Sequence, residues 1–349
     1  MKKINLSKLV RPSVCGLKAY NAKEIPCRVK LDANESPYAY DPRKIARLSA
    51  AIRTNRYPDP ESKELKEAAG KRFGVSPENI LQGNGSDELI YYLVAAFGGP
   101  VLFPVPTFSM YGIISRALGE RDIAVALNGE FDIDLERTLK AIRKEKPKLI
   151  FLSSPNNPTG NCFSSEKILK IIETSKGIVV VDEAYQPFSS ERGFMPLLRD
   201  YPNLVIMRTL SKIGLAALRV GFLIADSKII GEVNKVRLPF NVNSFSQAIA
   251  TAALRDRGLN SAIKTIVAER NKLFSEMERI DIRSYPSEAN FILFEVKNPD
   301  AVYTALLKRG VLVRNLNDSL KGCLRVTVGT PAENTLFVKA LREATQKIQ

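Results

Sequence analysis

The amino-acid sequence predicts an α/β protein: a large domain with a mainly parallel sheet sandwiched by helices, and a smaller α+β domain. Short apolar runs rich in β-branched residues alternate with amphipathic helical patterns over the first two thirds of the chain. Continuous apolar strands of this kind are typical of a parallel sheet that is covered on both faces. After about residue 245 the pattern changes to a long helical region followed by mixed strands and helices, which indicates the second domain.

The predicted elements are justified by apolar runs for the strands and by helical periodicity for the helices. In the large domain we expect strands at 100–104, 148–154, 177–184, 204–210 and 220–225, and helices that include 86–97, 134–144 and 165–175. Beyond it we expect a helical region to about 279, strands at 290–296, 311–316 and 323–328, and helices at 299–309 and 332–347. The boundaries that follow are an N-terminal arm at 1–45 that joins the small domain, a large domain at 46–245 and a small domain at 246–349.

The composition excludes several kinds of chemistry. The 349 residues include no histidine, which rules out Ser-His-Asp and Cys-His nucleophile systems and every zinc site that contains histidine. The four cysteines are scattered without a C-x-x-C motif, so we expect no disulfide framework, no metal site and a cytoplasmic location. No apolar run reaches the roughly 20 residues of a membrane helix, and the first residues do not have the pattern of a secretory signal.

The net charge of +15, from 52 basic and 37 acidic residues, has three interpretations. It is compatible with nucleic-acid binding, with an ordinary basic surface, and with a positive field that attracts anionic small molecules. The charges are spread along the chain without blocks of like charge, and no recognition module is found. We therefore expect no nucleic-acid partner.

Polar groups stand where predicted strands end, and active sites of parallel sheets lie at the carboxyl ends of their strands. Asn157 lies in the loop SSPNNPTG after one strand, Asp182 ends the run VVVD, and Lys212 follows the strand at 204–210 within TLSK. A fourth group, GNGSDEL, places Ser86 as the expected N-cap of a helix whose N–H groups suit a phosphate. Simpler alternatives are a turn for Asn157, a helix cap for Asp182 and a solvated loop position for Lys212.

Together these groups fit pyridoxal phosphate, which is therefore the expected cofactor. It needs a lysine for a Schiff base, a carboxylate for the pyridine nitrogen, donors at the phenolic oxygen, an aromatic ring on its face and a phosphate cup. The segment from 208 to 222 is poor in charge apart from Lys212 and Arg219 and resembles an interior segment, in which charged side chains need partners. The cofactor supplies both partners: its aldehyde for Lys212 and its phosphate for Arg219.

The order NNPTG, DEAY, TLSK and LRVG resembles the fold-type I pyridoxal-phosphate aminotransferases, and within that family its histidinol-phosphate branch. Further matching segments are LDANESPY at 31–38, NRYPDP at 55–60, NGSDELI at 84–90, PTFSMY at 106–111 and LRVTVGT at 324–330. The resemblance covers nearly the whole chain, and this many segments in the same order are much more specific than any one of them.

The resemblance implies roles for the matching residues. The catalytic set is Lys212, which would carry the Schiff base and move the α-proton, Asp182 at the pyridine nitrogen, and Tyr185, which with Asn157 would bond the phenolic oxygen. Phe108 would stack on the ring, and the phosphate side would be lined by Ser86, Asp87 through its backbone, Ser211 and Arg219. Tyr57 would reach the cofactor of the neighbouring subunit in a homodimer. The substrate site would be lined by Tyr20, Asn34, Arg314 and Arg325.

The implied reaction is ping-pong transamination between histidinol phosphate and 2-oxoglutarate, a step of histidine biosynthesis. Arg325 would take the carboxylate of glutamate or 2-oxoglutarate, and with Arg314 would share the substrate phosphate. The chain departs from the common pattern in one place: Arg219 follows Lys212 by seven residues rather than eight. Two alternatives stay open, namely another enzyme on the same scaffold (threonine-phosphate decarboxylase, aromatic or aspartate aminotransferase) and a basic nucleic-acid-binding protein.

Overall fold

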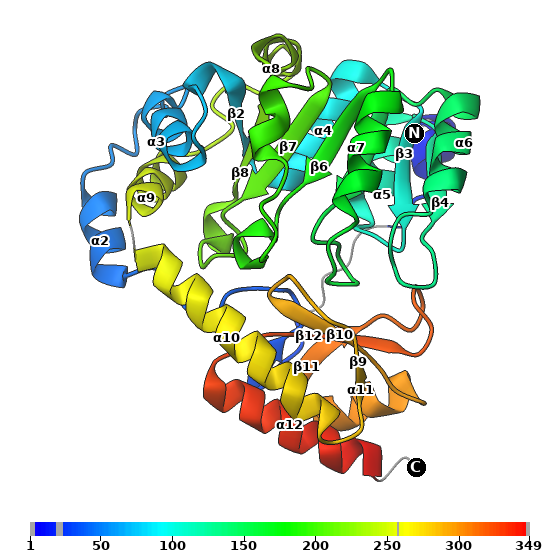
Figure 1. Ribbon diagram of the computed structural model, residues 1–349. Coiled ribbons are helices and arrows are strands. Elements are labelled where there is room, and N and C mark those ends of the chain that lie inside the picture. The colour runs from blue at the N-terminus through cyan, green and yellow to red at the C-terminus, as the bar shows by residue number, and fades with distance from the viewer. Residues whose placement is uncertain (1–3, 19–23, 257, 347–349) are drawn as a thin grey trace.

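The computed structural model describes residues 4–18, 24–256 and 258–346, which form two sheets flanked by helices (Figure 1). The larger sheet has seven strands in the order β2-β8-β7-β6-β5-β3-β4. Its strands are β2 (Ile80–Asn84), β3 (Val101–Val105), β4 (Asp122–Ala126), β5 (Leu149–Ser153), β6 (Ile178–Asp182), β7 (Leu204–Thr209) and β8 (Val220–Ala225). Only β8 runs antiparallel to its neighbours β2 and β7 in this part of the described chain. The predicted α/β class is confirmed.

Helices cover both faces of the larger sheet. One face carries α4 (Ser86–Phe97), α5 (Met110–Leu118) and α8 (Ser227–Asn234), and the other carries α3 (Lys63–Phe73), α6 (Leu135–Glu145) and α7 (Ser165–Thr174). Successive side chains of a strand point to opposite faces, so Val180 packs toward the first group and Val181 toward the second. The continuous apolar runs of the sequence follow from this burial on both faces.

The smaller sheet has five strands in the order β1-β11-β12-β10-β9. They are β1 (Val29–Leu31), β9 (Arg283–Ser284), β10 (Phe291–Glu295), β11 (Val311–Asn315) and β12 (Cys323–Thr327), with β1 parallel to β11 and the other pairs antiparallel. Three helices pack on it: α10 (Gly258–Glu278), α11 (Pro299–Lys308) and α12 (Pro331–Gln346). The N-terminal segment thus contributes a strand to the sheet formed by the C-terminal part of the chain.

The remaining elements are short or lie at the edge of the larger sheet. They are η1 (Leu6–Lys8), α1 (Pro12–Cys15), α2 (Pro42–Ala50), η2 (Pro77–Asn79), η3 (Gln186–Phe188), η4 (Met195–Arg199), η5 (Ala216–Leu218) and α9 (Ser244–Arg255). Among the described residues, no helix combines the length and the apolar character needed to cross a membrane.

The structure differs from the predicted elements in two respects. The sequence analysis does not predict the strands β1, β2, β4 and β9; β2 contains Gly83 and Asn84, which have low strand propensity and are typical of a turn. The helical region up to 279 is two helices, because Asp256 after α9 has an extended backbone (φ −87°, ψ 123°). The domain boundaries at 45 and 245 stay predictions.

A buried ion pair joins the carboxyl ends of β6 and β7. Glu183 is fully buried, and its Oε2 lies 2.6 Å from Nη2 of Arg208, whose side chain is largely buried. The other carboxylate oxygen accepts the backbone N–H of Phe194. Burial raises the pKa of Glu183 and lowers that of Arg208, and the attraction between the two charges opposes both shifts. Each charge is therefore tolerated because the other is present.

We expect Arg208→Met alone to lower the free energy of unfolding by about 3–5 kcal/mol, because it leaves the Glu183 carboxylate buried and unpaired. The double variant Arg208→Met/Glu183→Gln removes both charges and keeps an amide oxygen for Phe194, so it should be more stable than the single variant. Urea unfolding of the three proteins measures the difference. A double variant that is no more stable than Arg208→Met would contradict this account of the pair.

Candidate active site at the carboxyl ends of β5, β6 and β7

Three of the polar groups predicted from the sequence come together because β5, β6 and β7 are adjacent and parallel. Asn157 lies in the loop after β5, Asp182 is the last residue of β6, and Lys212 lies just beyond β7. The carboxyl ends of the strands meet at one edge of the sheet, which is where sites of open α/β sheets form.

Asp182 is 4% exposed, and both of its carboxylate oxygens accept hydrogen bonds. The Tyr111 hydroxyl donates to Oδ2 at 2.6 Å, and the Ala184 N–H donates to Oδ1 at 3.1 Å. No ion pair of Asp182 occurs within the described residues. Burial raises the pKa of this carboxyl, although both hydrogen bonds act in the opposite direction. The alternative that Asp182 caps a helix is wrong. Its carboxylate accepts from the N–H of Ala184, which lies before η3 and is not part of a helix N-terminus.

Tyr111 is a site residue that the sequence interpretation did not single out. It is fully buried on α5, stacks on Phe151 with ring centroids 4.8 Å apart, and meets the edge of Phe108 at 5.6 Å. Burial raises its pKa well above the ordinary value, so the hydroxyl stays neutral and donates. The segment PTFSMY, which ends at Tyr111, could have indicated this role, since a buried tyrosine hydroxyl needs a hydrogen-bond partner. The identity of that partner, 71 residues away in the chain, required the fold.

Lys212 is half-buried, with Nζ 5.7 Å from the centroid of the Tyr185 ring. It forms no ion pair with any described residue. Tyr185 is buried, and its hydroxyl accepts a hydrogen bond from Nδ2 of Asn34 at 2.9 Å. Lys212 is therefore not a solvated loop lysine: its amine faces an aromatic ring at the edge of the sheet, beside Asp182.

The loop that carries Asn157 is held by its neighbour, Asn156, which is fully buried. The Asn156 amide accepts from the Thr107 hydroxyl at 2.7 Å and donates to the Pro106 carbonyl at 2.9 Å and the Thr159 hydroxyl at 2.8 Å. These bonds join the loop after β5 to the loop after β3, which carries Phe108. The placement of Asn157 and Phe108 is thus set by one buried amide.

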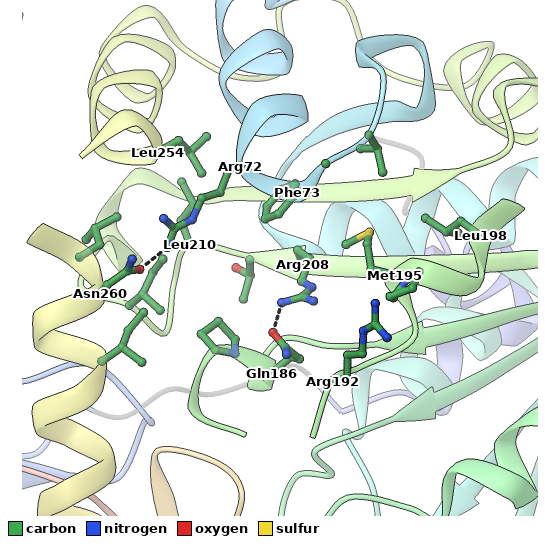
Figure 2. Close-up of a pocket in the computed structure, with 18 of the residues that line it drawn as sticks. Arg72, Phe73, Gln186, Arg192, Met195, Leu198, Arg208, Leu210, Leu254 and Asn260 are labelled. Atoms are coloured by element: carbon green, nitrogen blue, oxygen red, sulfur yellow. Dashed lines mark hydrogen bonds between the residues drawn. The ribbon is translucent and has the colours of Figure 1, made fainter. Parts of the chain in front are cut away.

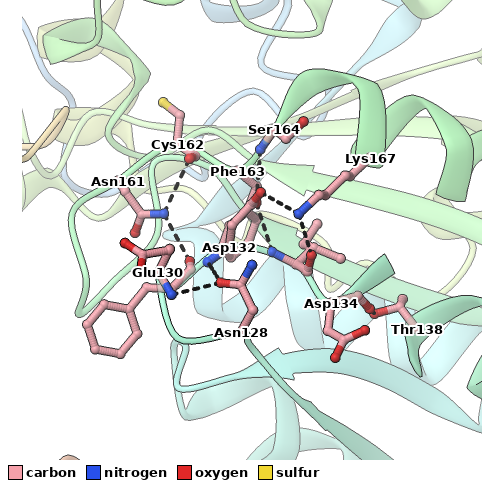
Figure 3. Close-up of polar contacts among 12 residues, drawn as sticks. Asn128, Glu130, Asp132, Asp134, Thr138, Asn161, Cys162, Phe163, Ser164 and Lys167 are labelled. Atoms are coloured by element: carbon pink, nitrogen blue, oxygen red, sulfur yellow. Dashed lines mark hydrogen bonds and ion pairs between the residues drawn. The ribbon is translucent and has the colours of Figure 1, made fainter. Parts of the chain in front are cut away.

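A second polar network fixes the far end of the same loop (Figure 3). The Asn161 amide donates to the Phe131 carbonyl at 2.9 Å. The Asp132 carboxylate accepts the Ser164 N–H at 3.0 Å and forms an ion pair with Lys167 at 2.8 Å. The loop is therefore anchored at both ends, in contrast to the ordinary turn considered from the sequence.

Residues of the smaller sheet reach the site through Arg325 on β12. Its guanidinium donates to the amide oxygen of Asn157 and to the Asp32 carbonyl (2.8 Å), and it lies 5.1 Å from the centroid of the Phe291 ring. Its register partner on β11 is Arg314, which is exposed. Directly paired residues of two strands lie on the same face, so the two arginines share one face of the smaller sheet.

Asn34 joins the N-terminal segment to both sheets. It is buried, its backbone N–H donates to the Thr327 hydroxyl at 2.9 Å, and its carbonyl accepts from the Asn290 amide at 3.0 Å. Its side chain donates to Tyr185. Asn34 thus lies against Tyr185, whereas Tyr20 lies outside the described residues.

The N-terminus of α4 forms the fourth part of the site, with one correction. The N-cap is Gly85, and Ser86 is the first helical residue, because Gly85 adopts φ +85°, a region that favours glycine. A Cβ at Gly85 would lie 2.5 Å from Nη2 of Arg219, so glycine also makes room for this arginine. The Arg219 guanidinium donates to the Ser211 hydroxyl at 3.2 Å. The seven-residue spacing therefore still brings Arg219 beside Ser211.

Two details of this part differ from the sequence interpretation. Asp87 takes part with its side chain, whose Oδ2 lies 3.5 Å from Nη2 of Arg219. The Arg219 side chain is 46% exposed, so this end of the segment is not interior. The cause is local: Arg219 follows η5 with a left-handed backbone (φ 52°), which turns its side chain toward Gly85 and the start of α4.

Tyr57 is the predicted site residue that the structure does not bring to this group. It is 82% exposed, and its ring stacks on Phe240 with centroids 4.6 Å apart. That is the one ring contact it makes among the described residues.

The arrangement offers a half-buried amine, a buried carboxylate and a helix N-terminus with an arginine, a set suited to an anionic cofactor that reacts with amines. The family model "Aminotransferase class I and II" matches residues 27–341. The chain belongs to the class I and II aminotransferases.

Relatives of this aminotransferase match it over nearly the full length. A protein from Aquifex aeolicus named histidinol-phosphate aminotransferase is 46% identical over 95% of this chain and 97% of its own length. One of the same name from Caldanaerobacter subterraneus subsp. tengcongensis is 40% identical over 97% and 99%. The solved structure of histidinol-phosphate aminotransferase from Sinorhizobium meliloti in complex with pyridoxal-5'-phosphate has a TM-score of 0.85, at 26% identity over 93% of this chain and 92% of that one.

We expect the buried Asp182 carboxylate to destabilise the cofactor-free aminotransferase as the pH rises. The pKa of Asp182 is raised in the folded state. The free energy of unfolding is therefore highest at a pH below the pKa of the unfolded chain, which is about 4. It falls by about 1.4 kcal/mol for each pH unit that separates the unfolded pKa from the folded pKa. Asp182→Asn removes this titration. Urea unfolding of both cofactor-free proteins at pH 5 and pH 8 should therefore show a smaller loss for the variant. Equal losses would mean that Asp182 ionises in the folded protein as it does in the unfolded one.

Proposed function

We propose that this aminotransferase uses pyridoxal phosphate to exchange an amino group between histidinol phosphate and 2-oxoglutarate, a step of histidine biosynthesis. The observation that carries the proposal is the Asp182 carboxylate, which is buried and forms no ion pair with a described residue, although the half-buried amine of Lys212 is close enough to lower its pKa. The two relatives at 46% and 40% identity, named for this reaction, support the choice of substrate. We further propose that the enzyme acts in the cytoplasm.

The described residues fit the cofactor at four points. The Asp182 carboxylate forms no ion pair with a described residue, and a protonated ring nitrogen would supply one. The first N–H groups of α4, together with Arg219 and Ser211, suit a phosphate. Asn157 and Tyr185 would bond the phenolic oxygen. Phe108 would contact the ring. When bound, pyridoxal phosphate supplies an aldehyde that reacts with amines and a ring that withdraws electrons from the substrate α-carbon.

In this proposal three residues move the proton, stabilise the ring charge and orient the carboxylate. The Nζ of Lys212 would hold the cofactor aldehyde and, with a substrate amine bound in the site, would take the proton from the substrate α-carbon. Asp182 would stabilise the positive charge of the ring nitrogen, and Tyr111 keeps Asp182 oriented through its hydrogen bond. Because Tyr111 is neutral, it orients the carboxylate without removing its charge.

The substrate side would be formed by Asn34, Arg314 and Arg325, with Tyr20 as a further proposed contact. Both substrates are anions, a phosphate ester and a dicarboxylate, and the planar guanidinium binds each in a bidentate manner. Arg325 is held by Asn157 and the Asp32 carbonyl, so its position is set before a substrate arrives. Arg314 is exposed on the same face and is available for the second charge of either substrate.

The reaction is tested with the purified protein and added cofactor. We expect a visible absorbance band that borohydride fixes on Lys212, and glutamate formation from histidinol phosphate and 2-oxoglutarate. Lys212→Ala should lower kcat by about 10²–10⁴-fold or more, because it removes the base. Lys140→Ala, an exposed lysine on α6, is the matched control and should keep full activity.

Other outcomes would redirect the proposal. A band that responds to aromatic amino acids or aspartate, but not to histidinol phosphate, would change the substrate and keep the cofactor. Release of carbon dioxide from threonine phosphate would indicate a decarboxylase. The absence of a band with excess cofactor would overturn the assignment of the site.

We also propose a homodimer in which Tyr57 reaches the cofactor of the neighbouring subunit. Exposed apolar side chains gather on two adjacent segments, 57–61 and 236–247, which are joined by the pair Arg237–Glu61 and the bond from Gln247 to Asp59. The exposed apolar residues of this surface are Tyr57, Val236, Leu238, Phe240 and Phe245. Large apolar patches of this kind mark association surfaces.

Mixing two defective variants tests the shared site. Lys212→Ala and Tyr57→Ala should each have low activity. In a mixed dimer one site receives both defects and the other receives neither, so dissociating and reassociating an equal mixture should restore about a quarter of the wild-type sites under random pairing. The control is the Lys212→Ala variant alone, dissociated and reassociated in the same way. No recovery, although mixed dimers form, would mean that Tyr57 acts within its own subunit.

A further inference from the structure

A cavity of about 850 Å³ lies beside β7 and apart from the site described above (Figure 2). Four segments line it: the end of α3 with the turn after it, η3 and η4 with the loop between them, the end of β7, and the start of α10 with the end of α9. Its volume lies within the range of roughly 300–1,000 Å³ that is typical of small-molecule sites.

The cavity and the Asp182 site lie on opposite faces of the larger sheet. In the parallel pairing of β6 and β7, Asp182 is opposite Met207, so these two side chains share a face. Arg208, the next residue, therefore points to the other face, where it lines the cavity. A ligand bound there would touch β7 without entering the site around Asp182.

The charge of the cavity wall is strongly positive. Its basic residues are Arg72, Arg192, Arg199, Arg208 and Lys264, and no acidic residue lies among the described lining residues. Arg208 is paired with Glu183, whereas the other four form no ion pair with a described residue. Of these four, Arg72 donates a hydrogen bond to the neutral amide of Asn260. Gathered like charges create a positive potential that a bound anion would stabilise.

The rest of the wall is apolar and includes an aromatic ring. Leu210, Ile213, Leu254 and Ile263 line the cavity together with Phe73. The Arg208 guanidinium carbon lies 6.0 Å from the centroid of the Phe73 ring. A bare inorganic anion would leave this apolar surface in contact with water. An anion with a flat organic body would bury it.

We propose that this cavity is a regulatory site for an organic polyphosphate with a planar body, of the size of a nucleoside triphosphate. The basic side chains would bind the phosphates, for which the arginine fork is suited. Phe73 and the aliphatic wall would receive the base. The proposal does not depend on the identity of the amino-group substrates.

The geometry also connects the cavity to the candidate active site. Leu210 and Ile213 line the cavity, and Lys212 lies between them in the chain. Thr209 also lines it, and its hydroxyl accepts the Ser211 N–H at 3.1 Å; Ser211 in turn accepts from Arg219. A ligand that shifts this short segment therefore changes the position of the amine and of the phosphate cup, and we expect it to alter the kinetic constants.

Binding is tested by calorimetry on the cofactor-loaded protein, with ATP as the probe and no added metal. We expect one ATP per chain, and binding of tripolyphosphate and of adenosine at least about tenfold weaker, since each offers half of the ligand. Arg192→Glu/Lys264→Glu should weaken ATP binding at least about tenfold. Lys140→Glu/Arg143→Glu, with exposed residues on α6 and the same change in net charge, is the matched control and should bind within about twofold of wild type.

Each alternative result overturns part of the proposal. No ATP binding, or an equal loss in both double variants, would mean that the cavity is not a specific site. Tripolyphosphate binding as tightly as ATP would mean that the apolar wall does not select the ligand. ATP that competes with histidinol phosphate would place the bound molecule in the active site. ATP binding that leaves kcat and KM unchanged would overturn the regulatory role.

Discussion

The buried carboxylate of Asp182 is the constraint on which the site depends. It ends a strand that is apolar on both faces, so the charge lies in a region that the fold has removed from water. The Tyr111 hydroxyl and one backbone N–H satisfy its oxygens but do not neutralise its charge, and burial raises its pKa. A carboxylate in this state favours a cation beside it. The fold thus keeps a local instability that cofactor binding is suited to relieve, a pattern typical of functional sites.

Two buried neutral amides, Asn34 and Asn156, join the segments around this carboxylate. Asn156 joins the two loops that carry Phe108 and Asn157, and Asn34 joins the N-terminal segment to Tyr185 and to the smaller sheet. An amide offers both donors and an acceptor, so one side chain connects several segments without adding a second buried charge. Arg219 and Arg314 are exposed, whereas Arg325 is buried and donates to the Asn157 amide oxygen and the Asp32 carbonyl.

Excess positive charge is distributed in two ways in this molecule. Many basic residues have acidic partners at the surface, such as Arg116 with Asp122. The cavity beside β7 differs, because four of its basic side chains lack such partners among the described residues. Of the three interpretations of the net charge of +15, the attraction of anionic small molecules agrees best with this arrangement. The sequence could not indicate it, because the five basic residues come from segments between 72 and 264.

The sequence by itself determined the class of fold, most strands and helices, and the chemistry of the candidate site. Apolar periodicity is a local property, so the helix at 86–97 and the strand at 220–225 match the structure residue for residue. Only the tertiary structure decided which distant side chains meet: Tyr111 with Asp182, Arg325 with Asn157, and the basic residues of the cavity. It also decided that Gly85 rather than Ser86 caps α4, because close packing against Arg219 requires glycine there. Local patterns record which residues are buried, but the pairing of buried polar groups depends on which segments the packed sheets bring together.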